Sequence, residues 1–134
     1  MKPRRVVVDT SILLSAFLVG GNPRTLFEAA RAGKIRLITS PTILAEFASI
    51  LKREFFWPDV DIREALMAIG RHVELVKPKR GLAMVEDEAD NRVLECDSEG
   101  KADMIVSGDR HLLSLERFGS VPILRASAFV ATLR

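Results

Sequence analysis

The sequence predicts an α/β fold in which helices cover a mostly parallel sheet on both faces. Two observations carry this prediction. Short apolar runs of strand length alternate with segments of helical periodicity along the 134 residues. The first run, Val6-Val7-Val8, is continuously apolar, which is typical of a parallel strand buried on both faces. Strands separated by helices in this way imply right-handed crossovers within one sheet.

The first half of the chain contains three expected strands and four expected helices. Ser11 is expected to cap the first helix, Pro23 and Pro41 suit first helical positions, and Gly33 suits a helix end. In chain order, the elements are the strand Arg5–Val8, the helices Ile12–Val19 and Pro23–Ala32, the strand Ile35–Ile38, the helices Pro41–Lys52 and Asp61–Arg71, and the strand Val73–Val76.

The second half repeats the alternation after an expected loop, Pro78–Gly81. Short β-branched and apolar runs again lie between helical patterns. The expected elements are the helix Asp90–Glu99, the strand Met104–Val106, the helix His111–Leu115, the strand Val121–Leu124 and the helix Ala126–Leu133.

Length and composition favour a single globular domain over residues 1–134. Apolar residues make up 48% and charged residues 28%, which argues against disorder. The single Cys96 excludes an internal disulfide and is typical of a reducing compartment, so we expect a cytoplasmic protein. No apolar run approaches the roughly twenty residues of a membrane span, and the basic start is not followed by a signal-peptide pattern.

Two aspartates follow strands that are expected to lie in the same sheet. Asp9 comes directly after Val6–Val8, and Asp109 closes the segment Ile105–Gly108. In an open parallel sheet, ligands bind in the crevice outside the carboxyl ends of the strands. Asp9 also suits the N-cap of the first helix, but Ser11 can take that role, so we favour a functional role for Asp9.

Glu46 and Asp90 are the other two acidic candidates, and both belong to helices. Glu46 falls on or beside the apolar face that Ile43, Phe47 and Ile50 form, and a buried carboxylate needs a partner such as a metal or an arginine. Asp90 belongs to the acidic run Glu86–Asn91, in which Asp87 and Glu88 are expected to be solvated. Asp90 stands out because Val93 and Leu94 anchor its turn to the core.

Carboxylates gathered at one sheet edge repel one another unless a cation joins them. The pattern therefore predicts a divalent metal site. Three further residues have supporting roles: Ser107 can donate a hydrogen bond to a site carboxylate, Asn91 can cap its helix or bind a ligand, and Asp103 lies at the opposite end of its strand, where a turn or cap role is the stronger interpretation.

Four segments together resemble the PIN-domain family, in the family's order and over nearly the whole chain. They resemble most closely its prokaryotic branch of toxin components of toxin–antitoxin systems, the VapC-like ribonucleases. One departure is the segment Cys96–Lys101, which is more polar than the family's Ala-rich helix end. The segments are Val-Val-Val-Asp-Thr-Ser-Ile-Leu-Leu-Ser-Ala (6–16), Leu-Ala-Glu-Phe (44–47), Asp-Glu-Ala-Asp-Asn-Arg-Val-Leu-Glu (87–95) and Ala-Asp-Met-Ile-Val-Ser-Gly-Asp-Arg-His-Leu-Leu (102–113).

The resemblance implies a three-layer α/β/α sandwich with a five-stranded parallel sheet. It also implies an endoribonuclease that depends on Mg²⁺ or Mn²⁺, forms a homodimer and is held inactive by an antitoxin protein. By position, the family's acidic site falls on Asp9, Glu46, Asp90 and Asp109, its small hydroxyl positions fall on Ser11 and Ser107, and the extra aspartate of this branch falls on Asp103.

Our hypothesis is that Asp9, Asp90 and Asp109 hold one or two metal ions, while Glu46 completes a second site or orients the attacking water. Mg²⁺ prefers oxygen ligands, so carboxylates are the right ligand types. One alternative is a phosphatase of the haloacid-dehalogenase type, although Ser11 stands where that class needs a second aspartate. The other alternative is an inactive PIN-like module that binds RNA without turnover.

Overall fold

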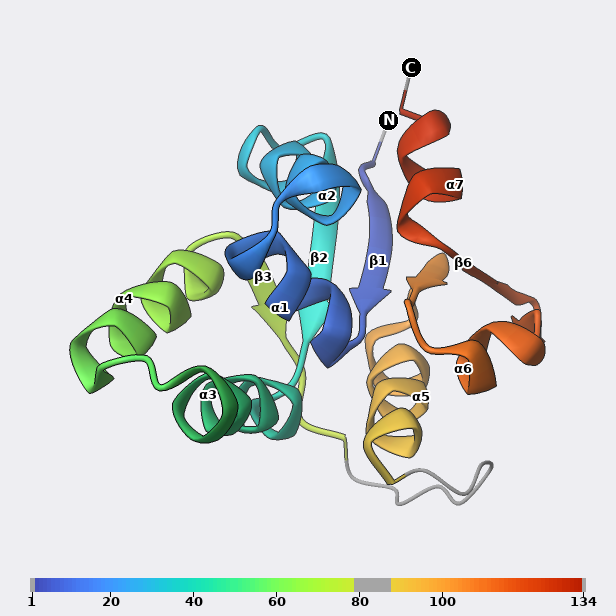
Figure 1. Ribbon diagram of the computed structural model, residues 1–134. Coiled ribbons are helices and arrows are strands. Elements are labelled where there is room, and N and C mark those ends of the chain that lie inside the picture. The colour runs from blue at the N-terminus through green and yellow to red at the C-terminus, as the bar shows by residue number, and fades with distance from the viewer. Residues whose placement is uncertain (1, 79–87, 134) are drawn as a thin grey trace.

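A computed structural model describes residues 2–78 and 88–133 and has the predicted α/β/α architecture (Figure 1). Its sheet contains the strands β1 (Arg4–Val8), β2 (Ile35–Thr39), β3 (Val73–Leu75), β4 (Met104–Val106), β5 (Arg117–Phe118) and β6 (Val121–Leu124), in the order β3-β2-β1-β4-β6-β5. All five expected strands are present and run parallel to their neighbours in this set.

β5 is a sixth strand that we did not expect. It pairs antiparallel with β6 at the edge of the sheet, with Phe118 opposite Val121. Gly119 lies between them with a φ of +63°, a conformation that glycine adopts without steric cost in tight hairpins. A strand of two residues is too short to show any alternation of apolar and polar residues, so its sequence carries no strand signal.

Seven helices lie in the described part of the chain, each within a few residues of its expected place. They are α1 (Thr10–Leu18), α2 (Gly21–Arg31), α3 (Pro41–Phe55), α4 (Asp59–Gly70), α5 (Glu88–Gly100), α6 (Arg110–Ser114) and α7 (Ala126–Ala131). Within the expected loop Pro78–Gly81, residues 79–81 lie outside the described part. None of these helices is long and apolar enough to cross a membrane.

The start of α1 corrects the expected helix cap. The helix begins at Thr10 rather than Ile12, because Asp9 and not Ser11 is the N-cap: its side chain accepts a hydrogen bond from the backbone N–H of Ile12. Both interpretations of Asp9, as a cap and as a residue of the sheet edge, therefore hold at once.

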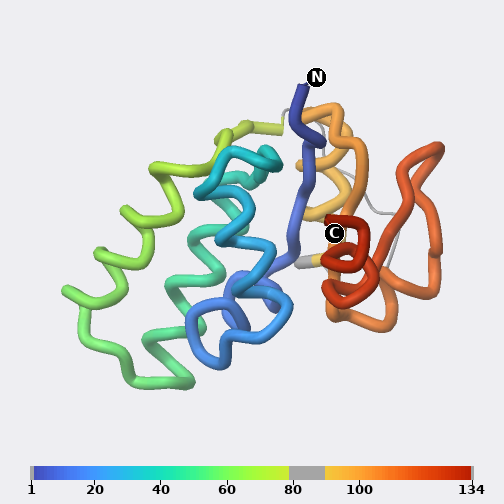
Figure 2. The backbone as a smooth tube through the Cα atoms, turned by 90° about the horizontal axis from the view of Figure 1, so that it is seen from above, coloured from blue at the N-terminus to red at the C-terminus, as the bar shows by residue number. Residues whose placement is uncertain are grey.

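The core lies between the sheet and its helices. Val6, Val7 and Val8 are at most 1% exposed, as expected for a strand covered on both faces. Figure 2 shows α1–α4 on one side of β1 and α5 on the other. α3 contributes the fully buried Phe47. Its ring packs against that of Phe17 from α1, with 5.6 Å between the two ring centroids. Each such side chain contributes roughly 1.5–3 kcal/mol by its burial.

An ion-pair network ties the strands together at the edge where they begin. Arg5 on β1 donates to both carboxylate oxygens of Glu74 on β3, and to the carbonyl oxygen of Gly100 at the end of α5. The Arg5 guanidinium lowers the pKa of the Glu74 carboxyl. Asp103 belongs to this network, because its carboxylate accepts the backbone N–H of Arg5 at 2.8 Å.

Two buried residues, Cys96 and Asp97, lie in the polar segment Cys96–Lys101 that includes the end of α5. Cys96 is fully buried, and burial raises the pKa of its thiol to about 12. Asp97 is 3% exposed, and its Oδ1 has no hydrogen-bond partner among the described residues. Burial raises the pKa of Asp97 to about 6.

Replacing Asp97 should therefore change how stability depends on pH. A carboxyl whose folded-state pKa is raised destabilises the fold progressively as pH rises from its unfolded value toward the folded one. We expect Asp97→Asn to be more stable than wild type by about 3 kcal/mol near pH 8, and the difference to shrink toward zero near pH 4. Urea unfolding over this pH range measures it.

Glu99→Gln is the matched control, because Glu99 is exposed on the same turn of α5. Glu99→Gln should leave the pH dependence of the free energy of unfolding the same as in wild type. Parallel pH profiles for Asp97→Asn and wild type would show that Asp97 does not titrate with the shifted pKa.

Candidate active site

The sheet places two of the predicted acidic residues side by side. β1 lies between β2 and β4, and the chain builds β2 and β3 on one side of β1 before it returns to place β4 on the other. This reversal is a topological switch point, where open α/β sheets bind their ligands. Asp9 follows β1 and Asp109 follows β4, so both stand at the carboxyl ends of the two central strands.

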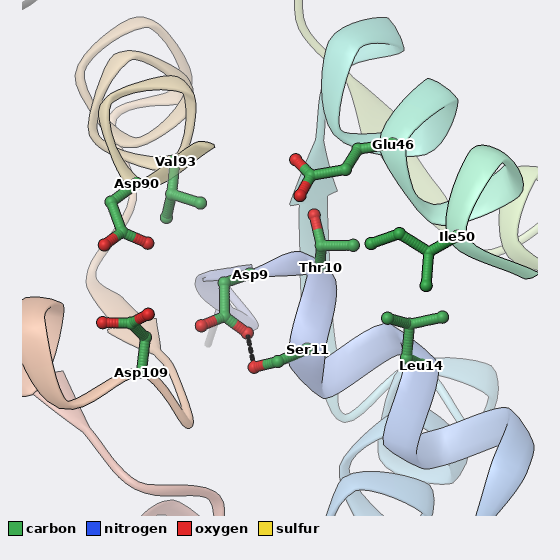
Figure 3. Close-up of a pocket in the computed structure, with 9 residues that line it drawn as sticks. All are labelled: Asp9, Thr10, Ser11, Leu14, Glu46, Ile50, Asp90, Val93 and Asp109. Carbon is green, nitrogen blue, oxygen red and sulfur yellow. Dashed lines mark hydrogen bonds between the residues drawn. The ribbon is translucent and has the colours of Figure 1, made fainter. Parts of the chain in front are cut away.

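A pocket of about 160 Å³ opens at this edge of the sheet. All four acidic residues predicted from the sequence line it (Figure 3). They arrive on separate elements: Asp9 precedes α1, Glu46 is on α3, Asp90 is in the first turn of α5, and Asp109 precedes α6. Figure 3 shows the carboxylates of Asp90 and Asp109 facing one another, with Asp9 beside them and Glu46 entering from the opposite side.

Three hydrogen bonds hold the Asp9 carboxylate in one orientation. Oδ1 accepts from the Ser11 hydroxyl at 2.6 Å and from the backbone N–H of Ile12 at 2.9 Å, while Oδ2 accepts from the Ser107 hydroxyl. Asp9 is only 4% exposed, so these donors replace most of the water that an exposed carboxylate would bind. The two serines predicted to support the site therefore both contact Asp9.

Ser107 also connects Asp9 to Asp109. Its hydroxyl donates to Asp9 and accepts the backbone N–H of Asp109 at 2.9 Å. Asp109 in turn caps α6, where its Oδ1 accepts from the N–H groups of His111 and Leu112 at 2.6 and 3.3 Å. Its Oδ2 accepts no hydrogen bond from the residues that the structure describes. One buried hydroxyl thus fixes the spacing of two acidic residues.

The other two supporting residues do not line the pocket. Asn91 is fully buried in α5, next to Asp90 in sequence. Asp103 precedes β4 at the opposite edge of the sheet, where its carboxylate accepts the backbone N–H of Arg5, in line with the turn or cap role that the sequence favours. The physical reason is direction: Asp103 and Asp109 stand at opposite ends of one strand. Glu86 and Asp87 lie outside the described residues.

Four lining residues were not predicted: Thr10, Leu14, Ile50 and Val93. Helical spacing could have indicated three of them. Leu14 lies three residues after Ser11, Ile50 four after Glu46, and Val93 three after Asp90, so each shares a helix face with a predicted site residue. Their apolar character suggested core positions instead.

The residues around the pocket fit a hydrated divalent cation. Among the described residues, the four charged groups that line it are all carboxylates, the ligand type that Mg²⁺ and Mn²⁺ prefer. A carboxylate offers about four acceptor positions, so Asp9 keeps one after its three hydrogen bonds, and Asp109 keeps its Oδ2. No three Asp, Glu, His or Cys side chains in the described residues are close enough to hold one ion directly.

Comparison with known proteins identifies one family. A family model described as PIN domain matches residues 5–111, a range that contains all four acidic residues of the pocket. The match ends before β5, β6 and α7. No curated protein matches the chain.

Removing the Ser107 hydroxyl should destabilise the fold. In Ser107→Ala, the buried Oδ2 of Asp9 loses its donor and the backbone N–H of Asp109 loses its acceptor. We expect a loss of about 1–3 kcal/mol in the free energy of unfolding, measured by urea denaturation.

Ser114→Ala serves as the control, since the exposed Ser114 hydroxyl bonds only the carbonyl of His111 in its own helix. It should change stability by less than about 0.5 kcal/mol. Equal effects of the two substitutions would contradict the bridging role of Ser107.

Proposed function

This chain belongs to the PIN-domain family, whose members are generally nucleases, and from that premise we propose that it is an endoribonuclease that depends on Mg²⁺ or Mn²⁺. The observation that carries the proposal is the pocket itself. Asp9, Glu46, Asp90 and Asp109 come from four separate elements and line one small space at the switch point of the sheet. Such a group of carboxylates repels itself and is stabilised by a shared cation.

The pocket residues have different roles in this proposal. Asp9, Asp90 and Asp109 hold the ion, directly or through its waters, and the three hydrogen bonds to Asp9 keep that carboxylate oriented before the ion arrives. Glu46, which faces them across the pocket, completes a second site or accepts a proton from the attacking water. When bound, the ion lowers the pKa of a coordinated water and neutralises charge on the phosphate.

The choice of substrate and partners rests on the sequence resemblance to toxin components. On that basis we propose RNA as the substrate, a homodimer as the working form, and an antitoxin protein as the inhibitor. A small DNA-binding protein encoded in the neighbouring reading frame would support the toxin role. Absence of any such frame would favour a nuclease without an antitoxin.

Neither alternative function gains support from a specific observation. For a haloacid-dehalogenase-type phosphatase, the second aspartate is replaced by Ser11, whose hydroxyl donates to Asp9. An inactive RNA-binding module would have the same pocket and differs only in turnover, so incubation of RNA with the protein separates it from a nuclease.

We expect Asp9→Asn to abolish RNA cleavage while the protein stays folded. Asn caps a helix about as well as Asp, so α1 keeps its N-cap, whereas the ion loses a negatively charged ligand. Cleavage of a labelled single-stranded RNA in Mg²⁺ or Mn²⁺ should fall at least about a hundredfold. Chelation of the metal should stop the wild-type protein equally.

Asp103→Asn is the matched control, because Asp103 is an aspartate at the opposite edge of the sheet. It should keep most of the wild-type activity. Full cleavage by Asp9→Asn, or by wild type in excess chelator, would refute the proposed function.

A further inference from the structure

One wall of the acidic pocket is aliphatic. Leu14 on α1 and Ile50 on α3 line the pocket together with the acidic residues. Both side chains are half-buried, and Figure 3 shows their ends facing each other beside Glu46 and Thr10. We call these two side chains the apolar wall.

Leu14 and Ile50 are not among the fully buried core residues of their helices, although Leu14 packs against the core on one side. α1 buries Ile12, Leu13 and Ala16, and α3 buries Ile43, Phe47 and Leu51. Leu14 and Ile50 instead keep part of their surface open to the pocket. Exposed apolar groups next to charged ones gain nothing from water, so their position indicates contact with a ligand that has an apolar surface.

The apolar wall and the carboxylates of Asp90 and Asp109 occupy opposite sides of the pocket, and Glu46 lies on the side of the apolar wall. Asp90 and Asp109 come from α5 and the segment after β4, whereas Leu14 and Ile50 come from α1 and α3, with Asp9 between the two sides. A hydrated cation needs only the charged side. A ligand that fills both sides therefore has one end that binds with the cation and one apolar end.

We propose that the apolar wall is a subsite for the base of the nucleotide next to the scissile phosphate. The inference rests on the proposed nuclease function and extends it to how the substrate is held. A nucleotide combines a phosphate, which binds beside the carboxylates through the cation, with a flat base that has an apolar face. Leu14 and Ile50 carry no hydrogen-bonding group on their side chains, so the subsite accepts any base.

The subsite is tested by combining one substitution in the protein with one change in the RNA. Steady-state cleavage compares wild type with Ile50→Ala on a short single-stranded RNA of defined cleavage site, and on the same RNA with an abasic nucleotide beside that site. Ile50→Ala should raise KM about five- to tenfold on intact RNA with kcat within about twofold, because it removes apolar contact with the base. For wild type, the abasic RNA should raise KM by a similar factor. For Ile50→Ala, KM should be the same on the abasic RNA as on the intact RNA, because both changes remove the same contact.

Met67→Ala is the control, since Met67 is 52% exposed on α4 and does not line the pocket. It should leave KM unchanged on both RNAs. Two results would refute the subsite while the nuclease function stands. In the first, wild type cleaves RNA but Ile50→Ala has the same KM as Met67→Ala. In the second, the effects of Ile50→Ala and of the missing base on KM multiply in full, as independent contacts would. If wild type cleaves no RNA in Mg²⁺ or Mn²⁺, the nuclease function fails, and the subsite fails with it.

Discussion

The convergence of four carboxylates on one pocket at the carboxyl ends of the central strands is the constraint on which the rest of the structure depends. Like charges brought near one another repel, and they do so more strongly near a protein surface than in bulk water. The fold offsets part of this cost with neutral dipoles. Asp9 and Asp109 each cap a helix, and two serine hydroxyls donate to Asp9. The positive end of each helix dipole also favours a negative charge at that position.

The rest of the fold keeps these carboxylates from moving apart. β1 and β4 are paired in the centre of the sheet, and their last residues are buried, so the residues that follow them have little freedom. At the other end of the strands, Arg5 joins β1, β3 and the end of α5. α5 is thereby held at its last residue, while its first turn presents Asp90 to the pocket. The ion pair and the pocket lie at opposite ends of the same elements.

Much of the site could be predicted from the sequence because strand ends and helix faces follow simple periodicities. Asp9 and Asp109 were predicted from the apolar runs before them, and Glu46 from its place on an amphipathic helix; all of them line the pocket. The N-cap could not be assigned, since Asp9 and Ser11 are both good capping residues and only the geometry decides between them. Leu14 and Ile50 were missed because an aliphatic side chain has the same pattern whether it faces the core or a ligand.

β5 and Asp97 are two further features that could not be predicted from the sequence. β5 depends on a tight turn at Gly119 rather than on any pattern of its own residues. Asp97 is a charged residue in a buried position, which solvation rules place on the surface. Its burial follows from the packing of α5 against β1 and β2, a contact between distant segments that local sequence does not report.

The most direct measurement of the central claim is anomalous scattering from a crystal of this protein grown in Mn²⁺. If the carboxylates exist to share a cation, a manganese peak will lie in the pocket, bound directly or through water to Asp9, Asp90 and Asp109. A map in which that pocket holds no manganese, while the ion is present at millimolar concentration, would contradict the account.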